Sequence, residues 1–292
     1  MKTKLTHLSI ILAGYIACIY SMQFTWSLLS DFSLVSKVFI CHVEATIFIY
    51  ILSVLFNNSS WYDAFWSVIP VALTVMCWSD ISAAGDVQRA FLMHACLLFW
   101  AIRLTYNWIR SWEGFSHEDW RYVMMKGKTE NKFQYFMVDF GSIHLIPTIC
   151  VYMALLPMIY ALAYPGDVLN LLDAVATLLA VIAVIIQIIS DQQMYNFRKN
   201  ISEPQTMQSG LWFYSRHPNY FGEILFWFSL FVFAIAADIG FAWLLIGCVI
   251  MYALIAIASV AMMDKRSLLR RPDFKEYMDS TPPIFINFFK KG

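Results

Sequence analysis

The chain has 292 residues, of which 60% are hydrophobic, 17% aromatic and only 14% charged. A soluble domain carries roughly 25% charged residues, so this composition excludes an ordinary soluble protein. The 20 Lys and Arg balance the 20 Asp and Glu, and a net charge of zero gives no overall electrostatic attraction to nucleic acid. The composition predicts an all-α, polytopic membrane protein whose surroundings and partners are membrane lipids.

Apolar runs of about 20 residues, the length that a helix needs to cross a bilayer, divide the chain into about eight spans. We predict these spans at residues 8–30, 33–56, 61–83, 88–110, 140–163, 168–190, 220–237 and 240–263. The first run follows Lys2 and Lys4 and resembles a signal peptide. No small-residue cleavage site follows it, so we expect it to be an uncleaved span.

The Lys and Arg residues gather on one side of this predicted bilayer. The loops 111–139 and 191–219 and the tail 264–292 hold most of them, whereas the connector 164–167 on the other side holds none. The positive-inside rule therefore predicts that these loops and both termini are cytoplasmic. The rule is the same for the endoplasmic reticulum membrane of a eukaryote and the inner membrane of a bacterium.

The six cysteines all fall within the predicted spans, and no two of them form a CxxC pair. We interpret them as small core residues, since a free cysteine behaves as a small apolar side chain. The sequence therefore predicts neither disulfides nor a metal site.

The densest group of polar residues lies at the start of the seventh predicted span, where segment 215–223 reads Ser-Arg-His-Pro-Asn-Tyr-Phe-Gly-Glu. Pro218 suits the first turn of a helix, which predicts Arg216 and His217 beside a positive helix N-terminus that favours phosphate. Glu223, one turn further, is expected to pair with Arg216 or to accept a hydrogen bond from a ribose hydroxyl. The alternative is that His217 and Pro218 only cap the helix.

A polar stripe precedes this motif. Gln187, Asp191, Tyr195 and Arg198 recur at helical spacing, so they share one face of the helix that ends the sixth span. Ionisable groups at a membrane edge face protein or water, because lipid would be costly. We interpret the stripe as one wall of a cofactor pocket on a helix that projects beyond the bilayer. The alternative is a snorkelling helix end with a local Asp–Arg pair.

Two further groups complete the polar pattern. Trp212 follows a glycine break and offers an aromatic face for stacking on a flat ring. Beyond the last span, Arg270 and Arg271 precede a proline and an aromatic residue, and they are candidates for ligand contact. We interpret Lys265 and Arg266 as an ordinary positive flank that binds anionic lipid headgroups.

Together these motifs resemble the DUF1295 family, which belongs to the steroid 5-alpha-reductase C-terminal superfamily. The resemblance is carried by segments 61–67, 100–108, 118–122, 191–198, 210–212 and 215–223. It leaves out the first two spans, residues 1–56, and we expect residues 57–292 to form the membrane domain of the family.

The resemblance implies a membrane-embedded reductase that uses NADPH to reduce a double bond in a sterol-like or isoprenoid lipid. In relatives, polar groups at the cytoplasmic helix ends contact the dinucleotide. With Tyr195 and Trp212 added, the predicted cofactor-binding residues are Asp191, Tyr195, Arg198, Trp212, Arg216, His217, Asn219, Tyr220, Glu223, Arg270 and Arg271.

In such a reductase the cofactor supplies hydride, and an acid within hydrogen-bonding reach supplies a proton. The candidate acids in the earlier spans are Tyr106, Asp80 and Glu44. Arg103 also lies inside a span, where an unpaired charge is costly, so we predict that it pairs with Asp80. That pair either serves the site or only locks two helices together.

Two other functions fit the motifs. Lipid and isoprenylcysteine methyltransferases that use S-adenosylmethionine also place an Arg-His-Pro-x-Tyr block before a hairpin of spans. A lipid-binding protein without catalysis is the second alternative. The Asp191–Arg198 stripe and the upstream segments favour the reductase.

Overall fold

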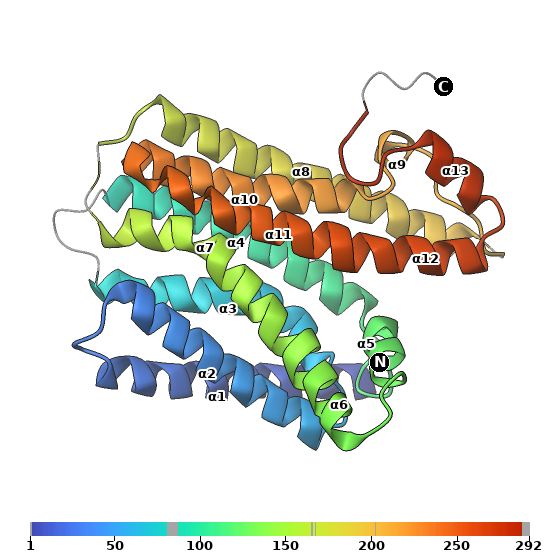
Figure 1. Ribbon diagram of the computed structural model, residues 1–292, viewed down its shortest axis with the longest axis horizontal. Helices are drawn as coiled ribbons and strands as arrows, with labels where there is room; N and C mark the ends of the chain where they lie inside the picture. Colours follow the sequence, from blue (N-terminus) through green and yellow to red (C-terminus); the bar gives the residue numbers. More distant parts are fainter. Residues whose placement is uncertain (1, 81–86, 165, 167, 202, 288–292) are drawn as a thin grey trace.

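The chain folds into a bundle of helices (Figure 1). The computed structural model describes residues 2–80, 87–164, 166, 168–201 and 203–287. Over these ranges every regular element is a helix, and no strand is present. The predicted all-α class is therefore confirmed.

Seven helices are long and apolar enough to cross a membrane, so the chain is an integral membrane protein. They are α1 (Lys2–Leu28), α2 (Leu34–Leu55), α4 (Val87–Ser111), the continuous run of α6 (Lys132–Phe136), η2 (Met137–Leu145) and α7 (Ile146–Ala163), α8 (Leu171–Asn200), α10 (Pro218–Ala237), and the run of η3 (Ile239–Leu244), α11 (Leu245–Ala253), η4 (Leu254–Val260) and α12 (Ala261–Arg270). The remaining predicted span is shorter: α3 (Trp61–Met76) ends early and continues as the 3-10 turn η1 (Cys77–Asp80). The short helices are α5 (Trp120–Lys126), α9 (Leu211–Tyr214) and α13 (Phe274–Ser280).

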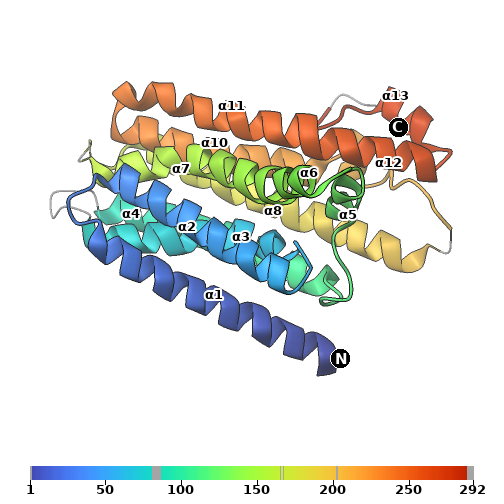
Figure 2. The same ribbon diagram turned by 60° about the horizontal axis from the view of Figure 1, so that its bottom comes forward.

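The long helices form two groups that α7 joins. Helices α4, α8, α10 and α11 lie on one side, and α1, α2 and α3 lie on the other, with α7 crossing between them (Figures 1 and 2). Gly222 allows α10 to approach α8 closely, because a Cβ atom there would lie 2.7 Å from the Ala183 carbonyl oxygen. This contact places the start of α10 against the middle of α8.

The short helices gather at one end of the bundle. The start of α1, α5, α6, α9, α13 and the end of α12 all lie at this end (Figure 1). The turn 29–33 and the start of α8 lie at the other end (Figure 1). This arrangement agrees with the predicted grouping of the loops that are rich in Lys and Arg, while the cytoplasmic location of that end stays a prediction.

A buried ion pair joins three helices at the opposite end. Arg89 of α4 donates from Nε and Nη2 to the two carboxylate oxygens of Asp173 of α8, at 2.7 and 2.9 Å. It also donates to the carbonyl oxygen of Ala236 in α10 at 3.2 Å. Since a buried charge without its partner is strongly destabilising, this pair fixes α4, α8 and α10 relative to one another.

The six cysteines are all buried, and none of them forms a disulfide. They pack among apolar side chains, as expected for small core residues.

Candidate functional site

Two adjoining cavities lie where α8, α10 and α12 meet the short helices. The larger cavity has a volume of about 730 Å³ and the smaller about 310 Å³. Asn107, Asp191, Asn219 and Tyr220 line both of them, so the cavities meet at these side chains. The larger cavity lies among polar helix ends, whereas the smaller lies between membrane-spanning helices.

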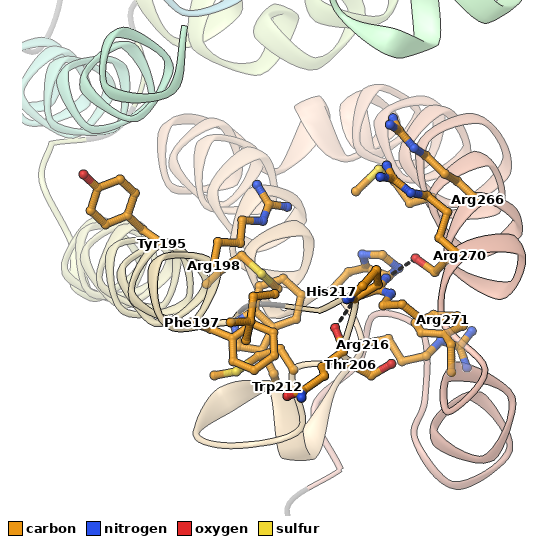
Figure 3. A pocket seen from close by; sticks show the side chains of 18 of the residues that line it. Tyr195, Phe197, Arg198, Thr206, Trp212, Arg216, His217, Arg266, Arg270 and Arg271 are labelled. Atoms are coloured by element: carbon orange, nitrogen blue, oxygen red, sulfur yellow. Dashed lines mark hydrogen bonds between the residues drawn. The ribbon is translucent and has the colours of Figure 1, made fainter. Parts of the chain in front are cut away.

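The larger cavity is built from three segments that are distant in the sequence (Figure 3). With 30 residues, α8 is about 45 Å long, which exceeds a hydrocarbon core of roughly 30 Å, so its last turns project beyond the bilayer. These turns face the 215–223 motif and the end of α12. Of the residues predicted to bind a cofactor, the lining includes Asp191, Tyr195, Arg198, Trp212, Arg216, His217, Asn219, Tyr220, Arg270 and Arg271.

Four arginines make one part of this cavity positive: Arg198, Arg266, Arg270 and Arg271 all line it. Figure 3 shows Arg266 and Arg270 extending from the same helix, with Arg198 reaching in from α8. Burial lowers the pKa of Arg271; Asp273 opposes the shift, and the neighbouring charges of Arg198 and Arg270 add to it. A bound anion would relieve this repulsion among like charges.

Arg216 and His217 are anchored to α12 and to the chain that follows it. Arg216 donates from Nη2 to Asp264 Oδ2, and from Nη1 to the carbonyl oxygens of Met278 and Thr281, all at 2.8 Å. The Nε2 atom of His217 lies 3.0 Å from the other carboxylate oxygen of Asp264. Asp264 therefore joins the 215–223 motif to α12, and Arg216 also joins the motif to the C-terminal tail through Met278 and Thr281.

Glu223 lies in the wall of the smaller cavity and is 7% exposed. Its carboxylate accepts N–H hydrogen bonds at 2.8, 2.9, 3.0 and 3.4 Å from Gln187, Trp100, Trp227 and Trp66 respectively. The expected pairing of Glu223 with Arg216 is therefore wrong, since Arg216 pairs with Asp264. The physical reason is the helix direction: Glu223 points from α10 toward α4 and α8, away from the tail.

Asp191 pairs with Arg103 at the junction of the two cavities. The Nη2 atom of Arg103 donates to Asp191 Oδ2, and the two side chains are 8% and 11% exposed. The predicted partner of Arg103, Asp80, is therefore wrong, and the Asp80 side chain lies outside the described residues. Two turns along α4, Arg110 stacks over the ring of Tyr195 at 4.0 Å. Helix α4 thus supplies a cation to two residues of the α8 stripe, Asp191 and Tyr195.

Neither cavity is lined by Tyr106 or Glu44, two of the predicted proton donors. The Tyr106 side chain is 63% exposed on the outside of the bundle. Glu44 accepts a hydrogen bond of 2.5 Å from the Ser21 hydroxyl, between α1 and α2. The structure therefore separates both residues from the place where the cofactor-binding candidates gather.

The smaller cavity is largely apolar with one polar wall. Its aromatic and aliphatic lining includes Tyr62, Trp66, Met125, Ile143, Pro147, Leu254, Ile255 and Met262. At the polar wall, Tyr122 of α5 donates from its phenol to Asp63 Oδ1 of α3 at 2.7 Å, beside Arg121. Two wall segments, η2 and η4, are π-helical, a geometry that frequently marks functional sites.

Three lining residues, Asp63, Tyr122 and Arg266, escaped the sequence-based prediction, and so did Asp264, which bonds Arg216 and His217. Asp63 and Tyr122 lie within segments 61–67 and 118–122, so the resemblance pointed to their neighbourhood without giving them a role. Asp264 and Arg266 follow the last span, where Arg266 was assigned to lipid headgroups and Asp264 had no role. Lining residues of this kind are recognisable only once the helices are packed.

Comparison with known proteins identifies a family without a described activity. The model of the family described as "Protein of unknown function (DUF1295)" matches residues 49–281, a range that holds every residue lining the two cavities. An uncharacterized protein of Schizosaccharomyces pombe is 23% identical over 258 residues, which cover 80% of this chain and 74% of that relative. No solved structure matches.

Proposed function

We propose that this chain, which belongs to the DUF1295 family, reduces a double bond in a sterol-like or isoprenoid lipid with NADPH. One observation carries the proposal: a polar cavity lined by six arginines meets an apolar cavity between membrane helices. The first suits a large anionic cofactor, and the second suits a lipid. Their junction at Asn107, Asp191, Asn219 and Tyr220 is the place where the two molecules would touch.

The lining of the larger cavity fits a phosphate-bearing nucleotide. Guanidinium groups bind phosphate oxygens through paired, charge-assisted hydrogen bonds, and Arg198, Arg270 and Arg271 would hold phosphates in this way. The Arg216 Nε and Asn219 Oδ1 atoms are buried and have no hydrogen-bond partner within the described part of the chain, so a ligand could satisfy them. When bound, NADPH would supply the hydride for the reduction.

The same charges favour a reductase over a methyltransferase. S-adenosylmethionine carries a positive sulfonium, which four arginines would repel, whereas NADPH carries several negative charges. A lipid-binding protein without catalysis would need only the smaller cavity. The arginine-lined cavity beside it would then have no purpose.

We further propose that the end of the bundle with the cavities faces the cytoplasm, where NADPH is available. The Lys and Arg content of its loops supports this orientation. The membrane would be the endoplasmic reticulum in a eukaryote or the inner membrane in a bacterium.

Titration of the purified protein in lipid nanodiscs with NADPH and, separately, with S-adenosylmethionine tests the proposal. We expect NADPH to bind, and Arg270→Gln to raise its Kd about tenfold, equivalent to ~1.4 kcal/mol, with a weaker dependence on salt. Lys275→Gln is the matched control, because Lys275 also carries a positive charge in the tail but pairs with Asp279 and is absent from both cavity linings.

Arg216→Ala is a poorer probe of the same site. It would untie the tail from Asp264 and so disturb the cavity wall whether or not a phosphate binds there. Binding of S-adenosylmethionine without binding of NADPH would overturn the reductase proposal, and so would equal NADPH affinity in the Arg270→Gln and wild-type proteins.

A further inference from the structure

We infer that Tyr122, supported by Asp63, is the acid that protonates the lipid substrate in the smaller cavity. The inference rests on the proposed reductase function and gives it a residue-level mechanism. Tyr122 lies on α5, outside the membrane-spanning helices, and its phenol reaches Asp63 at the start of α3. Both side chains line the smaller cavity, which continues into the larger one.

The other two carboxylates that line the smaller cavity, Asp191 and Glu223, already have strong hydrogen-bonding partners. Asp191 forms an ion pair with Arg103, and Glu223 accepts four N–H hydrogen bonds. Asp63 instead accepts from a phenol, a group that both donates and accepts hydrogen bonds. The Tyr122–Asp63 pair is therefore suited to pass a proton.

The other tyrosines that line this cavity, Tyr62 and Tyr220, do not bond a carboxylate. The hydroxyl of Tyr62 lies 2.8 Å from the Thr148 hydroxyl, and Tyr62 is only 3% exposed. Tyr220 bonds the Ser259 side chain. Tyr122 is half-buried and bonds Asp63, and this carboxylate partner distinguishes it from the other two tyrosines.

The electrostatic surroundings keep the phenol protonated. Burial raises the pKa of Tyr122 well above its usual value; the neighbouring Asp63 raises it further, and Arg121 opposes the shift. The Arg121 guanidinium, 5.7 Å from the centre of the Tyr122 ring, would stabilise a phenolate that forms during the reaction. Asp119 holds Arg121 in place with two hydrogen bonds of 2.9 Å.

The step balances for a carbonyl-conjugated double bond. Hydride adds to the carbon β to the carbonyl, and the electrons of the double bond move onto the carbonyl oxygen. The Tyr122 hydroxyl turns from Asp63 to that oxygen, its O–H bond breaks, and the proton transfer gives an enol that becomes the saturated ketone or aldehyde. A proton from the solvent then passes through the Asp63 carboxylate to the phenolate and restores Tyr122. Hydride and proton together supply the two hydrogens of the reduction.

The competing explanation is that this pair only fastens α5 to α3. A neighbouring tie offers a matched comparison: Lys126, one turn along α5, donates to the Ser59 hydroxyl at 3.1 Å and to Glu118 at 2.6 Å. Lys126 lines neither cavity. Lys126→Gln therefore removes a tie of the same helix without touching the proposed acid.

The test compares wild type, Tyr122→Phe, Asp63→Asn and Lys126→Gln in nanodiscs, with cholestenone and farnesal as a sterol-like and an isoprenoid probe. We expect Tyr122→Phe to lower kcat for NADPH oxidation by about a hundredfold, the scale of general acid catalysis, while the Kd of NADPH stays within about twofold. Asp63→Asn should lower kcat less, since its amide still positions the phenol. Lys126→Gln should keep kcat near the wild-type value.

Infrared spectroscopy of a probe with an isotope-labelled carbonyl supplies a second readout that needs no NADPH. A hydrogen bond from Tyr122 should lower the carbonyl stretching frequency of the bound probe, and Tyr122→Phe should restore the frequency of the free probe.

Each failure points to a different error. Undiminished kcat and an unchanged carbonyl frequency in Tyr122→Phe would refute the acid assignment and leave the reductase intact. Equal losses of kcat in Lys126→Gln and Tyr122→Phe would show that the Tyr122–Asp63 pair only holds α5 against α3. No NADPH oxidation by the wild type with either probe would count against the proposed function itself, and the acid assignment would fall with it.

Discussion

Two buried Arg–Asp pairs join α4 to α8, one at each end of the bundle, and they differ in how completely they are satisfied. Arg89 bonds both carboxylate oxygens of Asp173 as well as the Ala236 carbonyl oxygen, and both side chains are 2% exposed. Arg103 makes one contact to Asp191, its Nε atom has no partner in the described part of the chain, and both side chains line the cavities.

The difference separates a structural ion pair from a functional one. A saturated pair in a closed core has nothing left to offer a ligand, so its role is to position helices. An incompletely bonded pair beside a cavity keeps hydrogen-bonding capacity, which another molecule can use. Both pairs join the same two helices, so the surroundings decide the role.

The largest expected effect is the loss of stability when the Arg89–Asp173 pair is broken. Arg89→Ala leaves the Asp173 carboxylate buried without a cation, and we expect it to lower the free energy of unfolding by about 3–5 kcal/mol. Thermal unfolding in detergent measures the loss. Lys275→Ala breaks an ion pair whose side chains are 67% and 61% exposed, and it should change stability little. Equal effects of the two substitutions would remove the distinction between buried and exposed pairs.

Breaking the Arg103–Asp191 pair should affect stability less than breaking the Arg89–Asp173 pair and should affect the binding of NADPH more. In Arg103→Gln the Asp191 carboxylate stays close to cavity water, so the loss should be smaller than for Arg89→Ala. Its uncompensated charge would repel the phosphates of NADPH, and we expect the Kd to rise at least about tenfold.

Neutralising Asp191 as well tests whether its uncompensated charge causes the rise in the Kd of NADPH. The double variant Arg103→Gln/Asp191→Asn should recover part of the NADPH affinity in the same titration. A double variant that binds as weakly as Arg103→Gln would show that Arg103 contacts the cofactor directly.

The smallest expected effect concerns a partly exposed pair on α5. Burial alone would raise the pKa of Asp119, but hydrogen bonds from Arg121 hold it below its usual value. A depressed pKa stabilises the folded state above the free value of about 4, and this contribution is lost as the pH falls through the folded value. Trp120 fluorescence should report a small loosening of α5 on acidification below about pH 4, and Asp119→Asn should abolish that step.

Much of the fold was predictable because hydropathy is a local property. The spans follow from apolar runs, and the α8 stripe follows from helical spacing alone. One boundary was misjudged: α3 changes to a 3-10 turn at Cys77, six residues before the predicted end of the 61–83 span. The turn begins with the apolar residues Cys77 and Trp78, so hydropathy did not mark where the helix ends.

The partners of the charged residues were not predictable in the same way. Arg103 was matched with Asp80, on the neighbouring span, but it bonds Asp191, which is 88 residues further along the chain. Tyr106 looked suitable because it follows Arg103 by three residues, a spacing that keeps two side chains near one helix face, yet it is 63% exposed. Which face of a helix meets a cavity depends on packing between distant helices, and a single sequence carries no direct record of that packing.

The tether from Asp264 to Arg216 has a consequence for how the protein is made. The part of the cavity wall that carries Arg271, Phe274 and Tyr277 is translated after every long apolar helix of the described chain. The synthesis of all of those helices is therefore complete while the larger cavity still lacks one side. Maturation of the site is thus a late event in biogenesis.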